Sequence, residues 1–201
     1  MSASISRAQL LSRSAKGGAA LLVAGSALGQ LVDTAAAAPL PVSDLAYTRL
    51  LVGAELLAAD FYAQAIAAAN AGASVARYLK IAAFNEQEHY QAVARVLTGA
   101  GLTPAVAGDF EFSYPDGTFD TVGSIVTFGL QLETTILGAY LGALGAVQTD
   151  TVRTGIAPIA ACEAQHAAYF AEVKGLKAFG LSFPPALTID QASNAFDAYT
   201  A

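Results

Sequence analysis

The sequence is poor in several residue types, and each shortage excludes a class of protein. Its 201 residues include one cysteine, two histidines and no tryptophan. A single cysteine excludes an intrachain disulfide framework, and the lack of a Cys-x-x-Cys pair excludes a rubredoxin-type iron site. Basic residues are few as well: 10 Lys and Arg stand against 16 Asp and Glu, for a net charge of −6. Because nucleic-acid binding needs a basic face, this balance argues against a nucleic-acid partner.

Apolar residues make up 55% of the chain, and much of that fraction is alanine. Alanine suits closely packed helices as well as it suits lipid, so we expect an all-α fold. A possible N-cap at Ser43 or Asp44 begins the first segment. A turn is expected at 70–74, a long connection at 102–120 with a short extended stretch at 110–114, and a short helix after Thr188. The four expected main helices cover about 43–71, 75–97, 122–147 and 157–179.

The N-terminal segment 1–38 has the composition of an export signal. Arg7, Arg13 and Lys16 precede a mildly apolar run, and a small-residue stretch ends before Pro39. The segment 6–11 resembles a twin-arginine motif in which alanine replaces the second arginine. We therefore expect export to the periplasm, the cell envelope or the medium, with a more acidic chain left after cleavage. An uncleaved segment would instead anchor the chain in a membrane.

Both histidines close the same four-residue motif. Glu86-Gln87-Glu88-His89 and Glu163-Ala164-Gln165-His166 each lie in a segment expected to be helical. Residues three apart on a helix share a face, with Cβ atoms about 5–6 Å apart. Each motif therefore offers one carboxylate and one imidazole to the same neighbour.

A lone glutamate precedes each motif inside an apolar segment. Glu55 comes before the first motif and Glu133 before the second, and Glu133 is the only charged residue between Asp120 and Asp150. A buried ionised carboxylate is costly unless it is paired, and a metal ion is one possible partner. The alternative is a membrane-spanning helix with one buried acid. The order Glu, Glu-x-x-His, Glu, Glu-x-x-His is the ligand order of a di-iron or di-manganese site in a four-helix bundle.

The two halves of the chain repeat. The separation between Glu55 and Glu133 along the chain is nearly the same as the separation between the two Glu-x-x-His motifs. Tyr62 and Tyr140 each follow their lone glutamate by two helical turns, on the same helical face. We expect these tyrosines either to fill the core or to hydrogen-bond a metal ligand, with an electron relay as a further role. We interpret Cys162 as a small core residue, and no role is assigned to Asn85.

These motifs resemble the ferritin-like superfamily, and especially the exported ferritin-like-domain proteins that include the desiccation-related group. The resemblance covers residues 43–181 and rests on Glu55 with its flanking apolar residues, on Glu133 within its apolar run, and on the two Glu-x-x-His motifs. It implies a ferritin-like four-helix bundle built from two helical hairpins, with a long crossover between helices 2 and 3. We assign residues 1–38 to the export signal, 39–185 to the bundle and 186–201 to a C-terminal tail. The resemblance implies that two Fe or two Mn ions are bound by Glu55, Glu86, His89, Glu133, Glu163 and His166.

Four carboxylates and two imidazoles suit Fe(II) or Mn(II). The expected function is that of a di-metal oxidoreductase acting on Fe(II), O2 or hydrogen peroxide. Two alternatives stay open: manganese-catalase-like dismutation of peroxide, and a non-catalytic stress or desiccation role. The sequence leaves open whether the chain forms a homo-oligomer.

Overall fold

Four long helices form a bundle in the computed structural model, which describes residues 39–68, 73–178 and 180–200. They are α2 (Val42–Ala67), α3 (Ala73–Gly99), α4 (Val122–Ala146) and α5 (Asp150–Val173). A 3-10 turn, η2 (Ala107–Asp109), and a short helix, α6 (Ile189–Asp197), complete the described structure. The expected export segment falls within residues 1–38, outside the described part of the chain. The described residues hold no β-strand, only an isolated bridge between Phe112 and Thr200.

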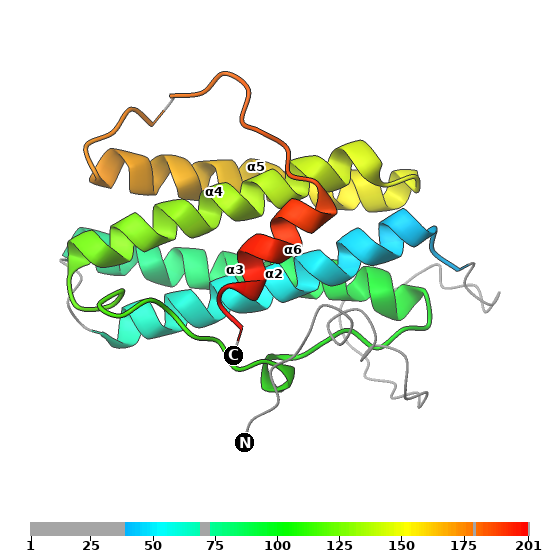
Figure 1. Ribbon diagram of the computed structural model, residues 1–201, viewed down its shortest axis with the longest axis horizontal. Helices are drawn as coiled ribbons and strands as arrows, with labels where there is room; N and C mark the ends of the chain where they lie inside the picture. The colour runs from blue at the N-terminus through cyan, green and yellow to red at the C-terminus, as the bar shows by residue number, and fades with distance from the viewer. Residues whose placement is uncertain (1–38, 69–72, 179, 201) are drawn as a thin grey trace.

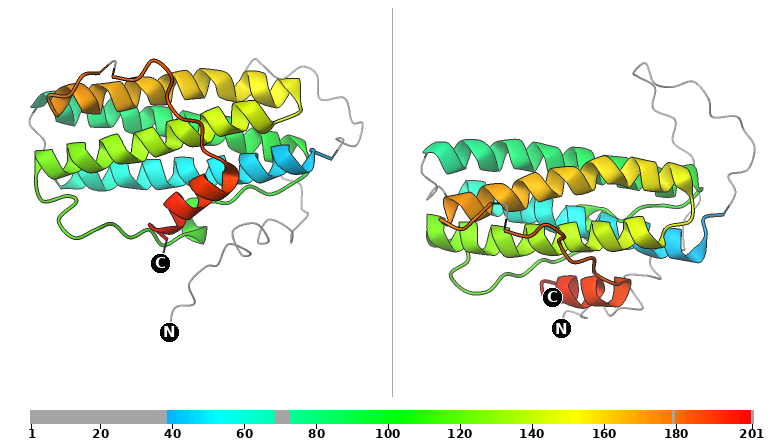
Figure 2. Two further views of the ribbon diagram at one scale, coloured as in Figure 1. Left: turned by 45° about the horizontal axis from the view of Figure 1, so that its top comes forward. Right: turned by 90° about the horizontal axis from the view of Figure 1, so that it is seen from above.

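The bundle consists of two antiparallel hairpins, α2 with α3 and α4 with α5 (Figure 1). The connection from 100 to 121 runs back along the bundle from the end of α3 to the start of α4, as both views in Figure 2 show. Such a connection between two hairpins is the single-crossover topology. The predicted all-α fold with a long crossover between its second and third helices is therefore confirmed.

The core lies between the four helices and is rich in aromatic residues. Phe61, Tyr62, Tyr140 and Phe170 are fully buried. Helices α2 and α4 are long and apolar enough to cross a membrane by length and composition. In their most apolar windows, however, 61% and 56% of the residues are buried within the bundle. Burial of this extent is what core helices of a bundle require. The length and composition of α2 and α4 are therefore only weak evidence for a membrane span.

Helix α6 lies across α4 and α2 (Figure 1). The chain reaches it by passing very close to α4. The Leu187 N–H donates to the carbonyl of Gly138 at 2.8 Å. A Cβ atom at Gly142 would lie 1.8 Å from the Leu187 carbonyl oxygen, so only glycine allows this approach. The C-terminal segment is thereby part of the packed structure.

The start of α5 differs from the expectation. The sequence predicted a helix from about residue 157, but α5 begins at Asp150 and contains Pro158. Proline lacks the N–H that would bond the carbonyl one turn earlier, and so it is normally placed near a helix start. Here Pro158 lies on the exposed face of α5. Its ring therefore does not disturb the core, and the helix continues through it without one backbone hydrogen bond.

The role of Asp44 also differs from the expectation. Helix α2 begins at Val42 after Pro41, with no side-chain cap. The buried Asp44 carboxylate instead accepts the backbone N–H groups of Gln148, at 2.7 Å, and Thr149, at 2.9 Å. Burial raises its pKa, but these hydrogen bonds outweigh burial and hold the pKa below its usual value. Asp44 therefore fastens the turn between α4 and α5 to the start of α2.

Candidate metal centre

The helix boundaries place four glutamates at one height in the bundle. Glu55 lies between three and four turns before the end of α2, and Glu86 lies a similar distance after the start of α3. Glu133 has the same placement relative to the end of α4, and Glu163 relative to the start of α5. At about 5.4 Å per helical turn, each carboxylate is about 20 Å from the end of its helix. The early start of α5 therefore makes the second hairpin as symmetrical as the first.

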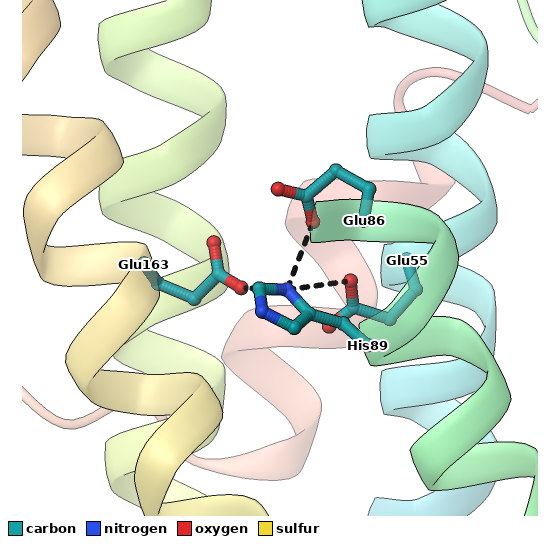
Figure 3. Close-up of side chains that lie close together, drawn as sticks. All are labelled: Glu55, Glu86, His89 and Glu163. Atoms are coloured by element: carbon teal, nitrogen blue, oxygen red, sulfur yellow. Dashed lines mark hydrogen bonds and ion pairs between the residues drawn. The ribbon is translucent and has the colours of Figure 1, made fainter. Parts of the chain in front are cut away.

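The first cluster surrounds His89 (Figure 3). Its Nδ1 atom lies 2.9 Å from Glu163 Oε1, 3.4 Å from Glu86 Oε2 and 3.7 Å from Glu55 Oε2. The three glutamates come from three different helices and are fully buried. Each of the four side chains offers one ligand atom within 4.8 Å of the others, which is close enough to share a metal ion.

A second cluster shares Glu86 with the first. It consists of Glu86, Glu133 and His166, whose ligand atoms also lie within 4.8 Å of one another. His166 Nε2 is 3.5 Å from Glu86 Oε1, whereas Glu86 Oε2 faces His89. The two oxygens of one carboxylate thus face the two histidines, as a bridging carboxylate would require. The structure brings together all six residues that the sequence proposed as ligands.

Several carboxylate oxygens in these clusters form no hydrogen bond, although Glu163 Oε1 lies within ion-pair distance of His89. These buried oxygens are Oε2 of Glu55, Oε1 of Glu86, Oε2 of Glu133 and both oxygens of Glu163. A buried carboxylate without a partner is strongly unfavourable. Cations would remove this penalty, and carboxylate oxygens with imidazole nitrogens are donors that suit Fe(II) or Mn(II). The residues present therefore fit a pair of divalent metal ions.

The pKa values of the four glutamates reflect their burial and the closeness of their negative charges. Burial is the largest cause raising the pKa of Glu55, Glu86, Glu133 and Glu163, and neighbouring glutamates raise it further at Glu55, Glu86 and Glu163. Burial lowers the pKa of His166 to about 4, with repulsion from His89 as a second cause. His166 is therefore a neutral imidazole at pH 7, in which one ring nitrogen carries a hydrogen and the other a lone pair.

Two buried tyrosines cross between the hairpins. Tyr140, on α4, donates its hydroxyl hydrogen to Glu55 on α2, and Tyr62, on α2, donates to Glu133 on α4. Each tyrosine thus binds the glutamate of the other hairpin, although it shares a helix face with its own. Both bonds use Oε1, so the Oε2 atom of each glutamate is left for another partner.

Sequence reasoning missed three residues at the second cluster. The Tyr78 hydroxyl lies 2.6 Å from His166 Nδ1, and Asn85 Nδ2 lies 3.3 Å from His166 Nε2. The interpretation of Cys162 as a core residue was wrong, because it is only partly buried and its Sγ lies 3.3 Å from the same Nε2 atom. The repeat contained a signal for two of them. Asn85 and Cys162 occupy equivalent positions in the two halves, each one helical turn before its histidine.

The fold and this site define a class: an all-α bundle of two hairpins with paired Glu and His side chains at its centre. A family profile described as ferritin-like domain matches residues 43–176, about two thirds of the chain. The chain belongs to this ferritin-like family. A comparison with curated proteins finds no match.

Proposed function

We propose that the chain is a di-metal carboxylate protein that acts as an oxidoreductase. Its ligands for two Fe or two Mn ions are Glu55, Glu86, His89, Glu133, Glu163 and His166. Such ions would supply redox chemistry on Fe(II), O2 or hydrogen peroxide. The observation that carries the proposal is the set of buried carboxylate oxygens without donors, arranged in two clusters that share Glu86.

Charge balance supports two ions in preference to one. Four ionised carboxylates carry four negative charges, and two divalent cations match them. The site can then be buried as a nearly neutral unit, which avoids the large desolvation penalty of isolated charges.

The two tyrosines would hold the ligands in place. Tyr140 and Tyr62 each fix one oxygen of a glutamate and so orient the other. Hydrogen-bonded partners of this kind set ligand orientation at metal sites. Burial is the largest cause raising the pKa of both phenols, so each keeps its proton and can donate it in the hydrogen bond.

Access to the site differs between its sides. The Tyr62 ring packs nearly parallel to the Phe170 ring, with centroids 6.2 Å apart, and both rings are fully buried on that side of the site. His89 retains 9% exposure, the most of the six proposed ligands. Small substrates such as O2 or peroxide would therefore enter beside α3, where His89 reaches the surface.

The experiment is metal loading of protein stripped with chelator, followed by elemental analysis. We expect about two Fe or Mn per chain, and turnover of O2 or peroxide by the loaded protein. Glu133→Ala should lose both properties, whereas Glu88→Ala, at an exposed position on α3, should keep them. Fe would favour oxidase or peroxidase chemistry, and Mn would favour peroxide dismutation. A wild-type chain that takes up neither metal, and that Glu133→Ala merely stabilises, would refute the proposal and support a non-catalytic scaffold.

A further inference from the structure

The outer face of α3 carries two large apolar side chains that remain in contact with solvent. Ile81 is 52% exposed and Phe84 is 65% exposed. They are three residues apart, so they lie beside each other on the helix surface. The opposite face of α3, with Leu79 and Glu86, is fully buried in the bundle. The right-hand view in Figure 2 places α3 on the side of the bundle away from α6, so α6 does not cover this face.

A charged residue follows the apolar pair at each end of the same face. Arg77 lies one helical turn before Ile81, and Glu88 lies one turn after Phe84; both charged side chains are exposed. Within the described part of the chain, neither Arg77 nor Glu88 forms an ion pair. The two are about 16 Å apart along the helix, which is too far for them to pair with each other.

The spacing of these four residues is symmetrical, whereas their charges are opposite. The separation from Arg77 to Ile81 equals that from Phe84 to Glu88. When two copies of α3 lie antiparallel about a two-fold axis between residues 82 and 83, residues equally far from the axis lie at the same height. Ile81 of one copy then faces Phe84 of the other, and Arg77 faces Glu88. The two-fold axis makes each of these contacts occur twice.

The charges also exclude the other simple arrangement of two α3 helices. Parallel helices in register would place Arg77 against Arg77 and Glu88 against Glu88. Like charges that face each other across an interface are unfavourable, whereas opposite charges fix orientation and register. A surface that is complementary to itself only in the antiparallel orientation is what a two-fold contact between identical chains requires.

We propose that the outer face of α3, formed by Arg77, Ile81, Phe84 and Glu88, docks a second copy of this chain as an antiparallel two-fold dimer. The apolar pairs provide burial, and the two ion pairs set the orientation. A contact centred on one pair of helices is smaller than a standard interface, so the dimer forms in a concentration-dependent manner. The four residues are not among the proposed metal ligands, so the inference does not rest on the proposed function.

Charge reversal in the full chain tests the pairing, with the mass measured by sedimentation equilibrium over a range of concentrations. The wild-type chain should approach twice its 20.4 kDa as the concentration rises. Arg77→Glu and Glu88→Arg should each raise the dimer Kd about tenfold or more, because each creates two like-charge contacts. The double variant with both changes should return to within about threefold of the wild-type Kd, since it restores both ion pairs.

The matched control is Asp116→Arg, which makes the same change of charge as Glu88→Arg at an exposed position in the connection between α3 and α4, and should leave the Kd unchanged. Neutral substitutions of Glu88 are uninformative here, because an exposed ion pair contributes little and only reversal adds repulsion. A wild-type chain that remains monomeric at its highest soluble concentration would overturn the proposal. A dimer that the single reversals do not weaken, or that the double reversal does not restore, would overturn it as well.

Discussion

Replacing Glu55 by glutamine should stabilise the metal-free protein at neutral pH. The Glu55 carboxyl is fully buried, its pKa is raised first by burial and then by the charge of Glu86, and its Oε2 has no donor. Glutamine has nearly the same shape as the protonated acid and can still accept the Tyr140 hydrogen bond. The substitution therefore removes an ionisable group with little change in packing.

The size of the effect follows from proton linkage. Below pH 4.5, the ordinary pKa of this group, the folded and unfolded chains both hold the proton and the carboxyl carries no penalty. Above it the unfolded chain releases the proton while the fold retains it, so stability falls by about 1.4 kcal/mol per pH unit. If the fold retains the proton up to pH 7, the penalty reaches about 3 kcal/mol, or about 6–12 °C in Tm. Glu55→Gln should recover this stability at pH 7 and none of it at pH 4.5.

The assay is urea unfolding of chelator-treated protein, followed by far-ultraviolet circular dichroism because the chain lacks tryptophan. Glu88→Gln is the matched control, since Glu88 is exposed on α3 and should change stability by less than about 0.5 kcal/mol. A Glu55→Gln effect that is the same at pH 4.5 and pH 7, or that destabilises the protein at pH 7, would refute the reasoning.

Three further predictions concern residues that orient a proposed ligand or hold parts of the bundle together. Tyr140→Phe should weaken metal binding about 10- to 100-fold, measured by metal titration, because Glu55 loses the hydrogen bond that orients it; unchanged affinity would mean that the phenol only fills space. Gly142→Ala should destabilise the protein by about 1–3 kcal/mol in thermal melts, because the added Cβ collides with the backbone before α6, whereas Gly145→Ala meets no atom within 4 Å and should be neutral or stabilising. Asp44→Asn should cost about 1–3 kcal/mol at pH 7. The loss should shrink as pH falls below the ordinary pKa near 3.8, because the unfolded wild-type chain is protonated there first, and it should vanish below the lowered pKa of the folded carboxylate.

Helix periodicity and the repeat predicted the fold well. The position of each Glu-x-x-His motif, the apolar runs around Glu55 and Glu133, and the long segment between the hairpins are all local features of the chain. Together they were enough to predict the four helices and their connection. The start of α5 was missed because proline is usually placed near a helix start, which set the expected start at about residue 157, whereas Pro158 lies inside α5, on an exposed face where its ring does not disturb the core.

The contacts within the site were less predictable, because they depend on how helices from different hairpins align. Periodicity placed Tyr62 and Glu55 on one face of α2, yet Tyr62 bonds Glu133 on α4. Cys162 and Asn85 occupy equivalent places in the repeat, but only the packing of α3 against α5 brings the two side chains together. Asp44 could not be assigned from its own helix, since its partners lie in the other half of the chain.

The most direct test of the di-metal claim is anomalous X-ray diffraction from crystals of the full chain loaded with Fe(II) or Mn(II). The account predicts two metal peaks inside the bundle, one beside His89 and one beside His166, with the Glu86 carboxylate between them. A bundle without peaks at these positions, in crystals exposed to either metal, would contradict it.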